Sequence, residues 1–180
     1  MRALLQRVTR AEVRIGGESI GSIGRGLVIL LGVAPGDDES VAAALAAKIA
    51  SLRIFADTEG LTNLSIREMR RSAAAGGAGG SAGARPVDEV SDVGGSALVV
   101  SQFTLFADAR RGRRPSFVGA AGLEVGERLY ESFCGALAAA GVPVERGRFG
   151  ADMAVELVND GPFTVWLDTV DLGIVAKSPS

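Results

Sequence analysis

The apolar positions near the start of the chain alternate, as they do in a strand with one buried face. In the stretch AEVRI, residues 11–15, the apolar side chains point to one side and the charged ones to the other. The glycine pair at 16–17 predicts a turn. The almost wholly apolar run LVILLGV, residues 27–33, predicts a strand that is covered on both faces.

Two longer segments show the spacing of amphipathic helices. After the loop APGDDES, apolar residues recur at i, i+4, i+8 and i+11 from position 41, which forms one stripe of a helix. Residues 123–140 carry a second stripe, and Gly141 supplies its C-cap. We therefore expect helices in both places.

Strands are expected to outnumber these helices. RIFADTEG predicts a strand that leads into a turn, and SALVVSQFTLFAD, residues 96–108, predicts a strongly apolar strand. Further strands are expected around residues 145–149, 153–158 and 163–169. The mixed order predicts the α+β class.

The stretch RRSAAAGGAGGSAGARP, residues 70–86, is dominated by glycine and small side chains that cannot form a packed core. Since 180 residues fit one domain, we expect a single domain over 1–180 with a flexible insertion at about 70–93. A glycine-rich phosphate loop is the alternative. We reject it because GGAGGSAG contains no Lys-Ser/Thr pair and opens no helix.

Two residue types limit the chemistry. The chain has no histidine, which excludes Ser-His-Asp triads, Cys-His dyads and histidine-ligated metals. The single cysteine, Cys134, excludes an intrachain disulfide and a thiolate zinc cluster, and its helical context favours a small buried hydrophobe. An enzyme of this composition works with carboxylates, hydroxyls, backbone groups or its substrate. We expect no metal and no cofactor.

Charge and hydropathy restrict the partners. The formal net charge is −2, so any binding to nucleic acid must come from a local patch. No apolar run reaches the ~18 residues of a membrane helix, and the N-terminal stretch lacks the pattern of a signal peptide. We therefore expect a cytoplasmic protein without a membrane partner.

The first candidate site is SQFTLFAD, which places the hydroxyls of Ser101 and Thr104 and the amide of Gln102 at the end of a buried strand. By composition alone, capping or turn hydrogen bonding is the preferred interpretation. Polar groups at a strand end also build small-molecule sites. A hydroxyl nucleophile would need a base, and the nearest carboxylates in sequence are Asp108 and Glu124.

The next stretch, ARRGRRPSF, places Arg110, Arg111, Arg113 and Arg114 within five residues. A solvated loop is one interpretation. An anion or phosphate site is the other, because guanidinium groups match phosphate oxygens and Phe117 can stack on a base.

The stretch NDGPFT, residues 159–164, interrupts a sequence that otherwise favours a strand. Asn, Asp, Gly and Pro are common turn formers, so a hairpin turn is the simpler hypothesis. The alternative is a rigid Gly161-Pro162 unit whose carbonyl groups point toward a ligand.

Taken together, these segments resemble the D-aminoacyl-tRNA deacylases, a family of chirality-proofreading enzymes. The resemblance rests on S-Q-F-T-L at 101–105 and N-x-G-P-x-T at 159–164, in matching order and spacing. It extends over about residues 1–66 and 94–167 through MRALLQRVTRAEV, GLVILLGV, RIFADTEG, RGRRPSF and GRFGADM.

The resemblance implies a homodimer in which flanking helices cover an antiparallel or mixed, β-barrel-like core. It implies hydrolysis of the ester that joins a D-amino acid, or glycine, to the 3′ end of tRNA. In this family the Gly-Pro pair, here Gly161 and Pro162 between Asn159 and Thr164, is cis and reaches into the partner subunit's active site. Its carbonyl oxygens occupy the space that an L side chain would need.

The resemblance also implies catalysis assisted by the RNA. The terminal 2′-hydroxyl would activate water, and main-chain N–H groups near Ser101–Thr104 would stabilise the oxyanion. A Thr104 nucleophile is the competing mechanism. Gln102 and Phe103 would border the adenosine pocket, and the arginines of 110–114 would meet the RNA backbone.

The sequence departs from the family pattern at the insertion within 70–93, at Phe163, where a smaller apolar residue is expected, and in the tail after residue 167. Two alternatives to the deacylase remain. One is a non-catalytic tRNA- or nucleotide-binding module that keeps the fold, and the other is an editing deacylase with altered chirality or amino-acid preference.

Overall fold

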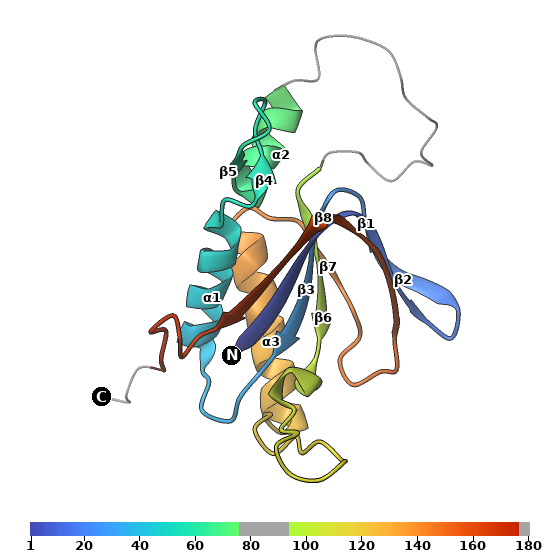
Figure 1. Ribbon diagram of the computed structural model, residues 1–180, viewed down its shortest axis with the longest axis vertical. Coiled ribbons are helices and arrows are strands. Elements are labelled where there is room, and N and C mark those ends of the chain that lie inside the picture. Colours follow the sequence, from blue (N-terminus) through green and yellow to red (C-terminus); the bar gives the residue numbers. More distant parts are fainter. Residues whose placement is uncertain (76–93, 177–180) are drawn as a thin grey trace.

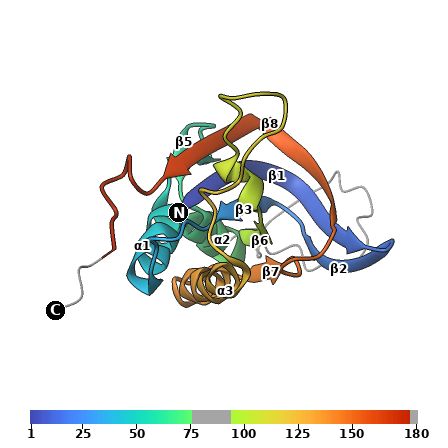
Figure 2. The same cartoon turned by 90° about the horizontal axis from the view of Figure 1, so that it is seen from below.

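The computed structural model describes residues 1–75 and 94–176, and 76–93 and 177–180 lie outside this description. A curved sheet carries helices on one face (Figures 1 and 2). The elements in chain order are β1 (Arg2–Ile15), β2 (Glu18–Ile23), β3 (Gly26–Gly32), α1 (Glu39–Ser51), β4 (Phe55–Ala56), β5 (Thr62–Leu64), α2 (Ile66–Ala75), β6 (Ser96–Ser101), the 3-10 helix η1 (Phe103–Phe106), α3 (Leu123–Ala139), β7 (Val144–Arg146) and β8 (Ala154–Asp168).

Strand β1 organises the sheet, since it pairs antiparallel with β2, β3 and β8. The parallel pairs β3–β6 and β6–β7 extend the sheet, so its order is β2-β1-β3-β6-β7, with β8 on the second edge of β1. Strands β4 and β5 form a separate small pair. The predicted α+β class with a mixed sheet is confirmed.

The sheet curls until its two ends meet, which makes the core barrel-like. In Figure 2, β1 and β8 form an arc above the helices. The terminal strands β2 and β7 contact each other in space. Gly21 of β2 marks this approach, because a Cβ there would lie 3.1 Å from the carbonyl oxygen of Arg146 in β7. Any larger residue would push the two strands apart.

Apolar side chains on the two faces of the sheet form two clusters. The cluster inside the curve consists of Val8, Ala11, Val13, Ile23, Val28, Leu98 and Val100. The cluster between the sheet and the helices includes Leu5, Leu27, Ile29, Leu45, Phe133 and Leu137. Strand β3 contributes to both clusters, which explains its uninterrupted apolar sequence.

Helices α1 and α3 confirm the two predicted helical stripes, and both pack against the same face of the sheet (Figure 1). The side chain of Asp38 caps α1 by accepting a hydrogen bond from the Val41 N–H at 2.9 Å. Gly141 follows α3 with φ +89°, the left-handed conformation expected beyond a helix C-terminus.

Several predicted strands are wrong in extent. The strand expected over 96–108 ends at Ser101, because its partner β3 ends at Gly32, and η1 follows. The strand expected around 145–149 covers only Val144–Arg146. The strands expected around 153–158 and 163–169 are one strand, β8, which runs through the Gly-Pro pair.

The sequence pattern does not indicate helix α2. Its final residues, 70–75, belong to the stretch that we expected to be flexible chain, and they are helical. The rest of the expected insertion, residues 76–93, lies outside the described residues.

Candidate active site

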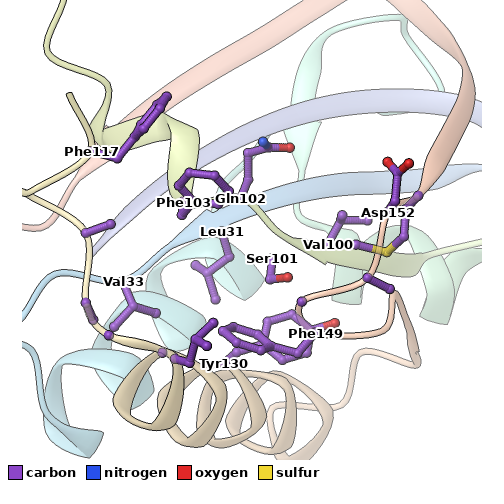
Figure 3. A pocket seen from close by; sticks show the side chains of 18 of the residues that line it. Leu31, Val33, Val100, Ser101, Gln102, Phe103, Phe117, Tyr130, Phe149 and Asp152 are labelled. Atoms are coloured by element: carbon purple, nitrogen blue, oxygen red, sulfur yellow. The ribbon is translucent and has the colours of Figure 1, made fainter. Parts of the chain in front are cut away.

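A cavity of about 560 Å³ opens where the parallel strands β3 and β6 end side by side. Helix α3 and the segment after β7 close its other sides (Figure 3). Small-molecule sites commonly have volumes of roughly 300–1,000 Å³. The lining residues include Ser101, Gln102, Phe103, Phe117, Tyr130 and Phe149.

The backbone changes direction at the mouth of this cavity. Ser101 ends β6, the Gln102 N–H donates to the Leu31 carbonyl at 2.7 Å, and η1 then begins. Within the described part of the chain, the N–H groups of Phe103 and Thr104 donate to no backbone or side-chain acceptor. Two adjacent free donors beside a cavity can bind a negatively charged oxygen.

The Thr104 hydroxyl contacts a neighbouring amide rather than a base. The Gln102 side chain donates to Thr104 Oγ1 at 2.5 Å. Arg110 donates to both carboxylate oxygens of Asp108, at 2.8 and 2.7 Å. These side-chain bonds and the Arg110 backbone N–H hold the pKa of Asp108 far below its ordinary value. Asp108 is therefore a poor proton acceptor, and Glu124, the other candidate, does not line the cavity.

Two aromatic rings form the apolar side of the cavity (Figure 3). The centroids of Tyr130 and Phe149 lie 6.0 Å apart. A Cβ at Gly126 of α3 would lie 3.0 Å from the Phe149 ring, so the helix approaches this ring closely. The Tyr130 hydroxyl donates to the Val99 carbonyl at 2.8 Å, and burial raises the pKa of Tyr130. Tyr130 is buried with its hydroxyl satisfied, so Phe149 offers the more accessible ring of the two.

Sequence reasoning missed Tyr130 and Phe149 as site residues. Tyr130 follows the helical pattern of α3, and Phe149 fell within an expected strand. The available signal is GRFGADM, an aromatic residue between glycines just after a strand, which is typical of a loop that shapes a site.

The Gly161-Pro162 pair lies in a wide bulge of β8, and its peptide bond is cis. Residues 160–163 stand opposite the single Arg7 of β1, so the N–H that proline lacks is not needed for the ladder. Both residues of the pair are exposed, and no residue of 159–164 lines the cavity of the same subunit. The hairpin-turn hypothesis is therefore wrong, because the strand continues on both sides of the bulge.

Asn159 and Thr164 hold the ends of the bulge together. The Asn159 Nδ2 group donates to Thr164 Oγ1 at 2.9 Å. The Phe163 N–H donates to Asn159 Oδ1, also at 2.9 Å. Both polar side chains of the motif thus bind the segment that carries Gly161 and Pro162.

Arg7 supports the bulge from β1. Its Nη1 donates to the Ile54 carbonyl at 2.7 Å, and its guanidinium lies 4.8 Å from the centroid of the Phe163 ring. Arg7 Nε lies 3.0 Å from a carboxylate oxygen of Asp160, in the geometry of an ion pair rather than of a hydrogen bond. A Cβ at Gly161, where φ is +125°, would lie 3.3 Å from Arg7 Nη2.

The basic loop, residues 109–115, ends two residues before Phe117, which lines the cavity. Two backbone hydrogen bonds of 2.7 and 2.9 Å between Asp108 and Ser116 close its base. The loop leads into Phe117, whose ring centroid is 5.0 Å from that of Phe103. Three of its arginines are exposed and form no ion pair within the described part of the chain: Arg111, Arg113 and Arg114.

Among residues 1–75 and 94–176, no group of three or more His, Cys, Asp or Glu side chains is placed to hold a metal ion. No helix in these ranges is long and apolar enough to cross a membrane. Cys134 is buried, and burial raises the pKa of its thiol to about 12, so the thiol is uncharged at neutral pH.

Two solved structures share this fold. The structure titled "c-Myc DNA Unwinding Element Binding Protein" is 34% identical, with a TM-score of 0.74 over 93% of this chain and 98% of that one. A probable eukaryotic D-amino acid tRNA deacylase is 17% identical, with a TM-score of 0.69 over 92% and 97%, and this likeness concerns the fold alone. The curled mixed sheet thus has the fold of these two structures.

The chain belongs to the D-Tyr-tRNA(Tyr) deacylase family, whose sequence model matches residues 4–74 and 82–168. The D-aminoacyl-tRNA deacylase of Dinoroseobacter shibae is 53% identical over 168 residues, which cover 93% of this chain and 99% of the relative. That of Ruegeria pomeroyi is 51% identical with the same coverage. The family expected from the sequence motifs is confirmed. The match leaves out the internal residues 75–81, which fall within the insertion predicted at about 70–93.

Proposed function

We propose that the protein hydrolyses the ester bond that joins a D-amino acid to the 3′ end of tRNA and releases the amino acid and intact tRNA. Family membership over most of the chain supports this activity. Within the structure, the observation that carries the proposal is the pair of free N–H groups at Phe103 and Thr104 beside an aromatic-lined cavity. Glycyl-tRNA is also a substrate in this proposal, because glycine has no side chain to be rejected.

In this proposal the terminal adenosine of the tRNA occupies the cavity. Its base lies against the half-buried ring of Phe149, and a base–aromatic stack of this kind is worth ~1–3 kcal/mol. Gln102 and Phe103 border the ribose at the mouth. The ester carbonyl then lies beside the N–H groups of Phe103 and Thr104.

Hydrolysis proceeds by attack of water on the ester carbonyl carbon. The 2′-hydroxyl of the terminal ribose activates the water, and the carbonyl electron pair moves onto oxygen. The Phe103 and Thr104 N–H groups stabilise this oxyanion. When the intermediate collapses, the 3′ oxygen leaves and takes up the proton given by water. This route needs no histidine, in agreement with a chain that has none.

The chirality filter in this proposal is the Gly161-Pro162 pair of a second subunit. The pair is exposed and lies outside its own cavity, so a homodimer would bring it to the cavity of the other subunit. The bonds of Asn159, Thr164 and Arg7 support the rigidity that a steric filter requires. Carbonyl oxygens in this position exclude an L side chain, while a D side chain points away from them.

We also assign the basic loop, including Arg110, to the RNA backbone. Arg111, Arg113 and Arg114 are exposed cations in the loop that leads into Phe117 of the cavity lining, whereas Arg110 forms an ion pair with Asp108. Phosphates beyond the terminal nucleotide are the anions that such a loop would meet.

Two other functions fit part of the structure. A non-catalytic nucleic-acid-binding module would use the same cavity and loop, and one structural neighbour is titled a DNA-element-binding protein. An editing deacylase of altered chirality or amino-acid preference would keep the catalytic backbone and change the filter.

Deacylation of matched D-aminoacyl-, L-aminoacyl- and glycyl-tRNA by the purified protein separates these functions. We expect rapid loss of the D and glycyl esters and persistence of the L ester. Failure to hydrolyse any D ester would contradict the deacylase function and favour the non-catalytic binding module. Rapid hydrolysis of the L ester would contradict the proposed chirality filter.

A matched pair of glycine variants on α3 links this activity to the cavity. Gly126→Leu forces atoms into the Phe149 ring and should abolish hydrolysis, whereas a Cβ at Gly135 meets no atom within 4 Å. Gly135→Ala should therefore retain wild-type turnover. Equal activity of the two variants would place the reaction outside this cavity.

A further inference from the structure

The guanidinium of Arg2 joins three elements near the mouth of the cavity. Its Nε donates to Asp168 Oδ2 of β8 at 2.8 Å, and its Nη1 donates to the Leu105 carbonyl of η1 at 3.0 Å. The guanidinium carbon lies 4.5 Å from the ring centroid of Phe106 and 5.7 Å from that of Trp166. Arg2 thus forms two directional hydrogen bonds and two ring contacts at once.

Helix η1 depends on these contacts because little else holds it. It is four residues long, has no side-chain cap, and contributes no fully buried residue to the core. Phe106 holds one side of η1 against β3. Its ring packs so closely on Gly32 that a Cβ at Gly32 would lie 2.9 Å from the ring. Arg2 covers Phe106 and binds the carbonyl of the preceding residue. Movement of η1 would therefore break its contacts with β1, through Arg2, and with β3, through Gly32.

We propose that Arg2 is a positioning residue that fixes the backbone of η1, and through it the Phe103 and Thr104 N–H groups, relative to the cavity. This inference rests on the proposed deacylase function and deepens it. Arg2 touches neither the cavity nor the substrate in this arrangement, because its bonds end at Leu105 and Asp168. Its effect should therefore fall on the rate of the chemical step rather than on binding.

Lysine cannot replace arginine in this role. A lysine ammonium can still pair with Asp168, but it lacks the planar fork that donates in two directions and stacks between two rings. Arg2→Lys should therefore restore the ion pair without restoring the geometry of η1. A purely structural role through the ion pair predicts the opposite, namely full rescue by lysine.

Steady-state and single-turnover deacylation of D-aminoacyl-tRNA test the inference. For Arg2→Met and Arg2→Lys we expect kcat to fall roughly 10- to 100-fold, the cost of small displacements of oxyanion donors, with KM within about twofold of wild type. Arg14→Met is the matched control, since Arg14 lies on the same strand and pairs with Glu12 at the surface. It should keep wild-type kcat.

Trp166 provides a second readout, because it is the single tryptophan of the chain. Binding of a non-hydrolysable amide analogue of D-aminoacyl-adenosine should change Trp166 emission in the wild type, through η1 and Arg2. The same saturating analogue should leave the emission of Arg2→Met unchanged. If the arginine variants fold poorly, Trp166→Leu is the alternative variant, because Trp166 is half-exposed and its ring contacts the Arg2 guanidinium. This variant should lower kcat and leave KM unchanged.

The outcomes of these experiments are distinct. Wild-type kcat in Arg2→Met, or full rescue by lysine, overturns the inference and leaves the deacylase function intact. Absence of D-ester hydrolysis by the wild type overturns the function and the inference together. A fall in kcat that merely follows the folded fraction of each variant, measured by thermal unfolding, assigns Arg2 to stability and also overturns the inference.

Discussion

The surroundings of Thr104 distinguish two mechanisms at the scale of a single residue. Its hydroxyl accepts a hydrogen bond from the Gln102 amide at 2.5 Å, and the carboxylate of Asp108 is engaged by Arg110. Its backbone N–H has no acceptor within the described residues. These contacts favour a role for the Thr104 main chain over a role for its hydroxyl as the nucleophile.

Replacement of Thr104 by alanine should therefore leave substantial deacylation, because the variant keeps the backbone N–H. We expect kcat to fall by less than about tenfold, whereas loss of a catalytic nucleophile costs several orders of magnitude. Single-turnover hydrolysis of D-aminoacyl-tRNA measures the difference. Complete loss of turnover with unchanged tRNA affinity would identify the hydroxyl as the nucleophile.

Cys134 carries a prediction about pH. Burial raises the pKa of its thiol from 9.0 to about 12. The folded state therefore holds its proton more tightly than the unfolded state does, and this contribution to stability is complete below about pH 9. It is lost as the pH rises from there toward 12. The free energy of unfolding should fall more steeply across this range in the wild type than in Cys134→Ala. Parallel pH profiles of the two proteins would contradict the prediction.

Helix α2 shows at the scale of an element how a short local signal can be overlooked. The Ser65 N–H and hydroxyl both donate to the Glu68 carboxylate, at 2.8 and 2.7 Å. The Glu68 N–H donates in turn to Ser65 Oγ at 3.3 Å. This S-x-x-E arrangement is a capping box, and it starts the helix at Ile66, the last residue of TNLSI.

Removal of this cap should destabilise the protein. Ser65→Ala should lower the free energy of unfolding by about 1 kcal/mol, measured by denaturant titration. Ser51→Ala is a matched control, because the exposed Ser51 hydroxyl only donates to the Lys48 carbonyl and its loss should change stability by less than about 0.5 kcal/mol. A smaller effect at Ser65 than at Ser51 would contradict the assignment of the cap.

The capping box also has a pH dependence. Hydrogen bonds from the Ser65 side chain and backbone lower the pKa of Glu68 from its ordinary 4.5. Because the folded-state pKa is depressed, this stabilisation is present above pH 4.5 and is lost as the pH falls through the lower value. The difference in stability between Ser65→Ala and the wild type should shrink in that acidic range.

At the scale of the whole molecule, the charge is unevenly distributed, and one loop is positive although the net charge is negative. The chain carries a formal net charge of −2, but the loop of residues 109–115 holds three exposed arginines without ion pairs within the described residues. Replacement of Arg111 and Arg113 by glutamine should weaken tRNA binding and flatten its dependence on salt by about one unit of log–log slope per phosphate contact. Arg110→Gln, which mainly breaks a pair with Asp108, should change the slope less. An unchanged slope in the double variant would place the RNA elsewhere.

The proposed filter can act within a subunit or across a dimer, and mixed dimers distinguish the two. A subunit with Gly126→Leu has a blocked cavity and an intact filter, and a subunit with Pro162→Ala has the reverse. In a tagged, purified heterodimer, the open cavity should reject L-aminoacyl-tRNA if the partner supplies the filter. Hydrolysis of the L ester at the same rate per open cavity as in the Pro162→Ala homodimer would show that each filter serves its own subunit.

The predicted strands fail where their partners decide the outcome. Residues 102–106 are as apolar as a strand, yet β6 ends at Ser101 because β3 offers no further partner beyond Gly32. The Gly-Pro pair interrupts the local strand signal, yet β8 continues because the bulge stands opposite Arg7 while both flanks pair with β1. Pairing over long sequence distances is not encoded in local periodicity, so these boundaries could not be read from the sequence.

The sequence by itself determined the buried strand over 27–33, the helices α1 and α3, the family, and chemistry without histidine. These follow from hydrophobic periodicity, motif spacing and residue counts, which are local properties of the chain. Only the tertiary structure decided that Tyr130 and Phe149 share a cavity with Ser101, and that Gly161-Pro162 lies outside it. Curling of the sheet brings distant segments together, and the physical reason is that burial of both faces of the sheet depends on the whole chain rather than on any one segment of it.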